Sequence, residues 1–323
     1  MRIRNIRSTL IIAAVASAAM LAGCSQSASK QLDSNRVNVV ASFYPLYDFS
    51  KKIGGEHVNV INVVPAGVEA HDWTPKSRDL QLLNNADVFV YEGAGFEGWV
   101  DDVLKSIPAD GPIVVEASHN VPLLKLEEAE EDGHGHGDEE KSDEHAHGEE
   151  GVDPHIWLSP SNAKIIGDNI KEALIKADPA HKAEFEANYK SFTESMDALD
   201  AKYKEQLGKV KQKELVTSHQ SFGYLCRDYG LTQMPIMGLS PDAEPTAQQM
   251  KNITTFIKEH QVRTIFFEEL VSDKLAKTLA KDAGVETAVL NPLEGLTEEQ
   301  QKNGEDYVSI MEKNLQQLVK ALQ

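Results

Sequence analysis

Two groups of histidines in this sequence have the neighbours and spacing expected of metal ligands. One group lies among glycines and carboxylates in the stretch GHGHGDEEKSDEHAHGEEG and consists of His134, His136, His145 and His147. The other group is dispersed: His71 stands in VEAHDWTP, His155 in VDPHIWLSP and His219 in VTSHQSFGYL. Neutral imidazole nitrogens bind zinc at about 2.0 to 2.1 Å, and a carboxylate, thiolate or water completes a tetrahedron. Both groups are therefore candidate metal sites.

The dispersed histidines are predicted to lie where strands give way to loops or helices. His71 follows the predicted strand 57–64 by a short loop, His155 precedes a helix, and His219 ends the predicted strand 214–219. The carboxyl ends of strands in an open parallel sheet gather at one edge, where ligands bind. Because two of these histidines come from the first half of the chain and one from the second, we expect a site between two lobes.

A fourth ligand for the dispersed group has several candidates. Glu268 and Glu269 close the apolar run IFFEE, and Glu294 ends the stretch LNPLE. Cys226 is a poor candidate because it lies seven residues beyond His219, inside the helix predicted there. Spacing alone does not choose among the carboxylates. The remaining histidines are interpreted as ordinary polar or capping residues, the commoner role of a lone histidine at a strand end: His57, His119, His181 and His260.

Strand and helix signals alternate along both halves of the chain, which predicts two parallel sheets. The strands are predicted at residues 37–43, 57–64, 86–93 and 112–118, and at 214–219, 233–239, 262–269 and 286–291. Thr74 and Ser159 are predicted N-caps because a proline follows each of them, while Thr246 and Ser272 are predicted to open two later helices. The fold class is α/β, with two lobes, each a mostly parallel sheet flanked by helices.

The domain organisation follows from these elements. Apolar residues at helical spacing predict a long inter-lobe helix over residues 179–210, about 40 Å in length. The predicted parts are a signal peptide (1–23), a flexible tether (24–36), an N-terminal lobe (37–125), a disordered acidic loop (126–152), a helix completing that lobe (153–178), the long helix, and a C-terminal lobe (211–323).

The formal charge of −19 argues against nucleic acid as a partner, since neutralising phosphates requires Lys and Arg. Much of that charge is local: residues 127–150 hold twelve acids against one lysine, a balance of −11. This segment has almost no apolar residue to offset its ordering entropy, which predicts disorder. Its four histidines are interpreted as a low-affinity metal collector or sensor, because each bound ion would first have to order the chain.

The first residues are typical of an export signal. Arg2, Arg4 and Arg7 precede the apolar run 9–20 and the tetrapeptide LAGC, which ends at Cys24. LAGC resembles the bacterial lipobox, which implies cleavage before Cys24 and attachment of a lipid to it. The apolar run is short and alanine-rich, and no later segment reaches the length of a spanning helix. We expect a protein outside the cytoplasm, anchored to the cell membrane by acyl chains.

Several motifs in order, AHDWTPKSRDLQLLNNADVFVYEGAGFEGW, VDPHIWLSP, LVTSHQSFGYLCRDYGL, IFFEELVSDKLAKTLAKDAG and LNPLEGL, resemble those of the zinc- and manganese-specific solute-binding lipoproteins of bacterial ABC importers. The resemblance implies two α/β lobes, one long rigid helix, and one ion held between the lobes. It implies His71, His155, His219 and Glu294 as ligands, with Glu268 as hydrogen-bonding support. The manganese-type relatives have a glutamate in place of His219, and a third imidazole favours zinc.

The resemblance therefore predicts a monomeric protein that is not an enzyme. It would bind Zn²⁺ as cargo and deliver it to an ABC permease with a cytoplasmic ATPase, since the chain has no GxxxxGK[ST] motif of its own. A manganese-binding homologue or a metal-dependent adhesin is the alternative. A zinc hydrolase is more remote, because no H-E-x-x-H occurs and four protein ligands would leave no position for water.

Overall fold

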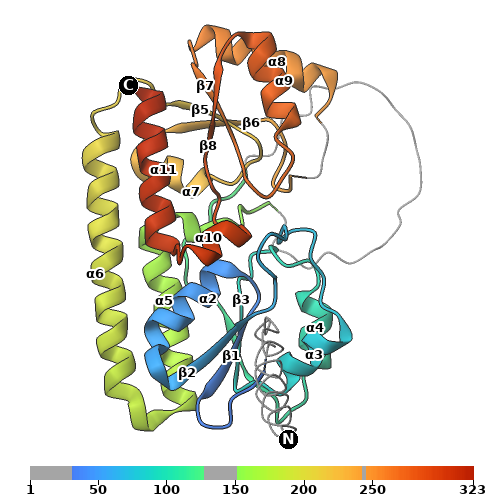
Figure 1. Cartoon of the computed structure of the whole chain (residues 1–323), viewed down its shortest axis with the longest axis vertical. Helices are drawn as coiled ribbons and strands as arrows, with labels where there is room; N and C mark the ends of the chain where they lie inside the picture. Colours follow the sequence, from blue (N-terminus) through green and yellow to red (C-terminus); the bar gives the residue numbers. More distant parts are fainter. Residues whose placement is uncertain (1–30, 127–150, 242–244) are drawn as a thin grey trace, which may run out of the picture. The chain divides into compact units, whose positions relative to one another are not determined.

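The computed structural model describes residues 31–126, 151–241 and 245–323 (Figure 1). The chain divides into two compact units, Met1–Gln31 and Leu32–Gln323, and the second unit holds every element considered below. The predicted signal peptide and Cys24 lie outside the described residues, as do His134, His136, His145 and His147. Among the helices of the described residues, none is both long enough and apolar enough to cross a membrane.

Two four-stranded sheets form the centres of two lobes, and all strand pairs in them are parallel. The first sheet has the order β2-β1-β3-β4 and consists of β1 (Val37–Ala41), β2 (Val58–Asn62), β3 (Val88–Tyr91) and β4 (Ile113–Glu116). The second has the order β6-β5-β7-β8 and consists of β5 (Glu214–Thr217), β6 (Thr232–Pro235), β7 (Thr264–Phe267) and β8 (Glu286–Val289). The predicted α/β class with two parallel sheets is confirmed.

Helices connect and flank the strands. In the first half they are α2 (Tyr44–Gly54), α3 (Ser77–Asn84), α4 (Val100–Ser106), α5 (Pro160–Ala177) and α6 (Lys182–Leu207). In the second half they are α7 (Gly223–Tyr229), α8 (Ala247–Glu259), α9 (Lys274–Ala283), α10 (Glu298–Lys302) and α11 (Tyr307–Leu322). Short 3₁₀ helices are formed by Gly55–His57, Ile156–Leu158 and Pro179–His181.

The long helix predicted between the lobes is present as α6, whose 26 residues extend about 39 Å at 1.5 Å per residue. It packs against α2 and α5 of the first lobe and against α7 and α11 of the second (Figure 1). Its buried side chains, among them Phe185, Met196 and Leu207, belong to one continuous apolar cluster that also includes residues of both sheets. The two lobes of this unit are therefore held by a shared core.

Each sheet has a second, separate apolar layer on its other face. In the first lobe Val40 and Phe89 of the sheet pack with Leu83 of α3 and Val103 of α4. In the second lobe Val216 and Ile265 pack with side chains of α8 and α9. Both faces of each sheet are therefore covered, as parallel sheets require, and function must be sought at the sheet edges.

The predicted helix starts are partly confirmed. The Ser159 hydroxyl accepts a hydrogen bond from the Asn162 N–H at 3.2 Å, with Pro160 at the first helical position of α5. The prediction for Thr74 is wrong: α3 begins at Ser77, because the Asp79 carboxylate accepts a hydrogen bond from the Lys76 N–H at 3.0 Å and fixes the first turn there. The prediction for Ser272 is also wrong, since Asp273 is the N-cap of α9.

Candidate metal centre

Four side chains from widely separated parts of the chain meet at the carboxyl ends of the strands. His71 lies in the loop after β2, His219 follows β5, and Glu294 follows β8. His155 directly precedes the 3₁₀ helix Ile156–Leu158. One ligand atom from each of these four residues lies within 4.8 Å of every other. The structure thus brings together the three dispersed histidines and one of the three candidate carboxylates.

The distances between these atoms have the size expected around a tetrahedral ion. Glu294 Oε1 lies 3.5 Å from the Nε2 atoms of His71 and His155 and 3.2 Å from that of His219. The Nε2 atoms of His155 and His219 are 3.4 Å apart. A tetrahedron with metal–ligand bonds of about 2.0 to 2.1 Å has edges of about 3.3 to 3.4 Å. The ligand atoms are therefore already spaced for a small divalent ion.

The centre contains buried polar atoms that lack hydrogen bonds within the described part of the chain. His155 and His219 are fully buried and Glu294 is 1% exposed. Neither oxygen of Glu294 nor Nε2 of His71 has a hydrogen-bond partner among the described residues. Burying a carboxylate without hydrogen bonds is costly unless positive charge lies beside it. A cation at the point where these atoms converge would satisfy them, so the residues present fit a bound metal ion.

Two carboxylates outside the cluster orient its imidazoles. Asp153 Oδ1 contacts Nδ1 of His155 at 2.8 Å and accepts a hydrogen bond from the backbone N–H of His155 at 2.9 Å. Glu268 Oε1 contacts Nδ1 of His219 at 2.6 Å and accepts a hydrogen bond from the Ser218 hydroxyl. Each contact occupies Nδ1 and turns Nε2 toward the centre, an arrangement common behind metal-binding histidines. Glu268 thus contacts a histidine of the cluster and is not one of the four converging groups.

The charges of the centre are coupled. Burial acts to raise the pKa of Glu294, but the charge of His219 and the contacts with the imidazoles hold that pKa well below its ordinary range. Burial likewise acts to lower the pKa values of His155 and His219, but their carboxylate neighbours outweigh it and raise both. Without an ion, protons on these imidazoles therefore compensate the Glu294 charge. A divalent cation would displace them.

The loop that carries Glu294 is fixed by contacts with several elements. Leu293 has a φ of 62°, which is rare for a leucine, and its N–H donates to the Asn291 side chain at 2.7 Å. Asn291 is held in turn by the side chain of Asn314 in α11. The Asn314 amide accepts a hydrogen bond from the Asn291 backbone N–H at 2.9 Å and donates one to the Asn291 backbone carbonyl at 2.7 Å. The Trp157 indole donates to the Pro292 carbonyl at 2.7 Å. These contacts place Glu294 against the first lobe.

Sequence reasoning did not identify Asp153 or Asn314. Asp153 carries a visible signal, an acidic residue two positions before His155, whereas nothing near Asn314 in the sequence connects it with Glu294. Cys226 is buried in α7 and is the free cysteine of the described residues. Burial raises the pKa of its thiol, and its sulfur is not among the converging ligand atoms.

The other histidines of the described residues have local surroundings of their own. The rings of His57 and His181 stack at 3.8 Å, and Nδ1 of His181 lies 2.5 Å from the Asp178 carboxylate. The ring of His260 stacks on Phe256 at 4.2 Å. None of them belongs to a group of three or more converging ligand atoms, because in the described part of the chain His71, His155, His219 and Glu294 form the one such group.

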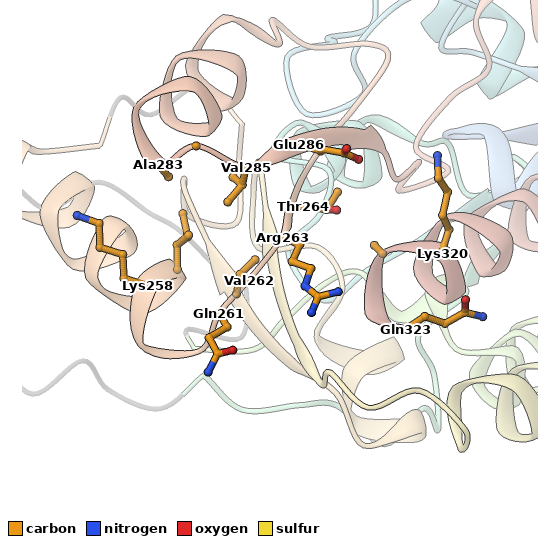
Figure 2. Close-up of a pocket in the computed structure, with 13 residues that line it drawn as sticks. Lys258, Gln261, Val262, Arg263, Thr264, Ala283, Val285, Glu286, Lys320 and Gln323 are labelled. Carbon is orange, nitrogen blue, oxygen red and sulfur yellow. The ribbon is translucent and has the colours of Figure 1, made fainter.

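A larger hollow lies elsewhere, at the amino ends of β7 and β8 (Figure 2). It has a volume of about 600 Å³, and its charged lining residues are Lys258, Arg263, Glu286 and Lys320. In the view of Figure 2, Arg263 lies between Lys258 on one side and Lys320 on the other. No histidine lines this hollow, and it has none of the convergent ligand atoms of the metal centre.

These features define a class of two-lobed α/β proteins. In this class, three imidazoles and one carboxylate between two parallel sheets are spaced to hold one small ion. The chain belongs to the ZnuA family, described as zinc-uptake complex component A, periplasmic, which matches residues 39–321. It is 39% identical over 306 residues to the high-affinity zinc uptake system protein ZnuA of Bacillus subtilis, with 94% of each chain covered.

Two further similarities agree with that membership. The chain is 42% identical over 301 residues to the zinc-binding lipoprotein AdcA of Streptococcus pneumoniae serotype 4; the match covers 93% of this chain and 58% of AdcA. The chain thus spans little more than half of that relative. The crystal structure of the Zn(II)-bound ZnuA-like domain of Streptococcus pneumoniae AdcA superposes with a TM-score of 0.73 at 39% identity, covering 89% of this chain and 99% of that domain.

Proposed function

We propose that this protein is the extracytoplasmic zinc-binding component of an ABC importer, and that His71, His155, His219 and Glu294 hold the ion. The observation that carries the proposal is the spacing of the four buried ligand atoms, 3.2 to 3.5 Å between Glu294 Oε1 and the three imidazoles. The relatives described above are zinc-binding or zinc-uptake proteins. Geometry and family membership thus support the same cargo.

The composition of the centre favours zinc over manganese. Three imidazole nitrogens and one carboxylate suit a borderline-soft ion, while Mn²⁺ prefers oxygen ligands in an octahedral arrangement. The complete burial of His155 and His219 leaves little room for the water ligands that manganese usually keeps. We therefore assign Zn²⁺ as the transported ion.

The same features support transport rather than catalysis. A catalytic zinc site has three protein ligands and keeps a position for water or substrate. Here four protein ligands would fill the tetrahedron, and Glu294 is 1% exposed. We propose that the protein captures and releases the ion unchanged.

The partners follow from the uptake role of the family. We propose that the ion passes to a membrane permease driven by a cytoplasmic ATPase, and that acyl chains on Cys24 keep the protein at the cell membrane. The description of the related AdcA as a lipoprotein supports the anchor. His134, His136, His145 and His147 are proposed to form a low-affinity collector.

Anomalous scattering across the zinc absorption edge, on crystals of the protein as purified, tests the proposal. We expect one zinc peak within bonding distance of the four proposed ligands. A competing-chelator titration of the same preparation should give one high-affinity zinc ion per folded chain. An ion bound elsewhere, or no high-affinity zinc in the titration, would show the proposal to be wrong.

A further inference from the structure

A small cavity adjoins the metal centre on the Glu294 side. Its volume is about 10 Å³, and four carboxylates line it: Glu69, Glu268, Glu269 and Glu294. A space of this size admits about one water-sized sphere. The cavity is thus large enough for a single ion passing through and too small for an organic ligand.

The lining carboxylates lead from the surface to the buried centre. Glu269 is exposed and Glu69 is partly buried, whereas Glu268 and Glu294 are 3% and 1% exposed. Oε2 of Glu268 and both oxygens of Glu294 have no hydrogen-bond partner in the described part of the chain. No Lys or Arg of the described residues forms an ion pair with any of the four. The ion-pair partners that Glu268 and Glu294 have are imidazoles of the metal centre, and the cavity leaves carboxylate oxygens of both residues without hydrogen bonds, available to a cation.

A hydrated ion cannot reach the buried imidazoles directly. His155 and His219 are fully buried, and the side chain of His71 is only 10% exposed. An ion entering the centre must lose its water molecules, which is costly unless protein oxygens replace them on the way. Carboxylates in a narrow space of low dielectric also attract cations and raise their rate of association.

We propose that this cavity is the passage by which a divalent cation enters the metal centre, and that Glu69 is a transient ligand on that passage. Oε1 of Glu69 accepts a hydrogen bond from the His71 N–H at 3.2 Å, so the carboxylate is held beside the first histidine. Glu69 is not one of the four groups that converge on the centre. It is therefore placed to receive the ion and pass it to Glu294 without holding it afterwards. The inference rests on the proposed zinc-binding function.

Stopped-flow kinetics on the full chain test the role of Glu69. Metal-free protein is mixed with Zn²⁺ and binding is followed by tryptophan fluorescence, because the Trp157 ring lies 5.3 Å from that of His155. Release is measured with excess chelator. Glu69→Gln keeps the hydrogen-bond acceptor and removes the carboxylate that would coordinate the entering ion. Glu298→Gln is the matched control. Glu298 is exposed, lies against Gly67 in the loop that carries Glu69, and does not line the cavity.

We expect Glu69→Gln to slow association by about tenfold, because a neutral amide is a poorer ligand for the entering divalent ion than a carboxylate. Release should slow as well, so that the equilibrium dissociation constant changes less than either rate. Glu298→Gln should behave like the wild type. An association rate unchanged in Glu69→Gln would overturn the inference, and so would equal slowing in the control. Faster release with unchanged association would make Glu69 a ligand of the bound ion and also reject the passage. Absence of equilibrium zinc binding in the wild type would instead refute the proposed function.

Discussion

The two edges of the second sheet differ in what they offer a ligand. At the amino ends of β7 and β8 there is an open hollow of about 600 Å³, and at the carboxyl ends there are His219, Glu294 and a cavity of about 10 Å³. Three cationic side chains at the hollow form no ion pair within the described part of the chain: Lys258, Arg263 and Lys320. Because the hollow is open, water can solvate their charges. At the metal centre, water has little access and ligand atoms are left unsatisfied.

The comparison shows that volume is a poor guide to an ion site. An ion needs a few convergent atoms at the right spacing, and burial makes those atoms costly when the ion is absent. The hollow meets neither condition, although it is far larger. Unsatisfied buried ligands, rather than open space, mark the functional edge of this sheet.

Replacing His155 by Ala should have the largest effect. It removes one ligand of the proposed tetrahedron and leaves the Asp153 carboxylate buried without its imidazole partner. We expect zinc affinity to fall by more than about 100-fold, the upper range for loss of an orienting partner alone. A competing-chelator titration measures this. Arg263→Ala, at the open hollow, is the control and should leave zinc affinity unchanged; equal losses in both variants would contradict the distinction between the edges.

Two carboxylate variants resolve roles within the metal centre. Glu294→Ala removes the oxygen at which three imidazoles converge, whereas Glu268→Ala removes only the partner of His219 Nδ1. We expect Glu268→Ala to weaken zinc binding by about 10- to 100-fold, and Glu294→Ala to weaken it further. Isothermal titration calorimetry with a competing chelator gives both values. The reverse order would move the fourth ligand to Glu268.

The sequence predicts the sheets because their strands are short runs rich in valine and isoleucine, such as Val37–Ala41, separated by helices of regular period. It also places the three histidines at strand ends, where parallel topology brings residues together. Spacing alone leaves the choice among Glu268, Glu269 and Glu294 open, and the family resemblance is what singles out Glu294. That choice depends on the positive φ of Leu293 and on the contact between Asn291 and Asn314, and neither feature has a local sequence pattern.

The start of α3 was mispredicted for a related reason. Proline at position 75 suits the first turn of a helix, which made Thr74 an attractive N-cap. The structure instead uses the Asp79 carboxylate to satisfy the Lys76 N–H, two residues further on. Spacing does not rank two capping signals that lie this close together in the sequence.

Lower pH should weaken zinc binding at the metal centre. The pKa values of His155 and His219 are raised by their carboxylate neighbours, so both imidazoles keep protons above the ordinary histidine value of about 6.5. Zinc must displace these protons, and affinity should rise as pH increases through the raised pKa values. We expect a loss of about tenfold per pH unit for each displaced proton as pH falls.

Calorimetry in buffers of different ionisation enthalpy counts the protons that zinc releases. We expect proton release near neutral pH, where a histidine with an ordinary pKa would already be mostly neutral. The His155→Ala variant should release fewer protons, because one of the two titrating imidazoles is gone. Zinc binding without proton release at neutral pH would contradict the charge state assigned to the metal-free centre.

Deleting residues 133–150 should have the smallest effect on the metal centre. The two ends of the acidic segment are joined within the described residues: the Leu126 N–H donates to the Gly151 carbonyl at 2.6 Å, and Lys125 forms an antiparallel bridge with Val152. Residues 127–132 would then close the loop between these paired ends. Tyr224 also holds both ends, since its hydroxyl accepts from the Leu124 N–H at 3.0 Å and donates to the Asp153 carbonyl at 2.7 Å.

Because these contacts remain in the deletion variant, Asp153 should keep its position behind His155. We expect one high-affinity zinc ion per chain with the affinity of the wild type, and loss only of weaker ions that bind His134, His136, His145 and His147. Zinc titration of both proteins, without and with a chelator of moderate affinity, separates the two classes. Loss of the high-affinity ion would mean that the acidic segment, rather than the buried centre, holds it, because the deletion leaves all four proposed ligands in the chain.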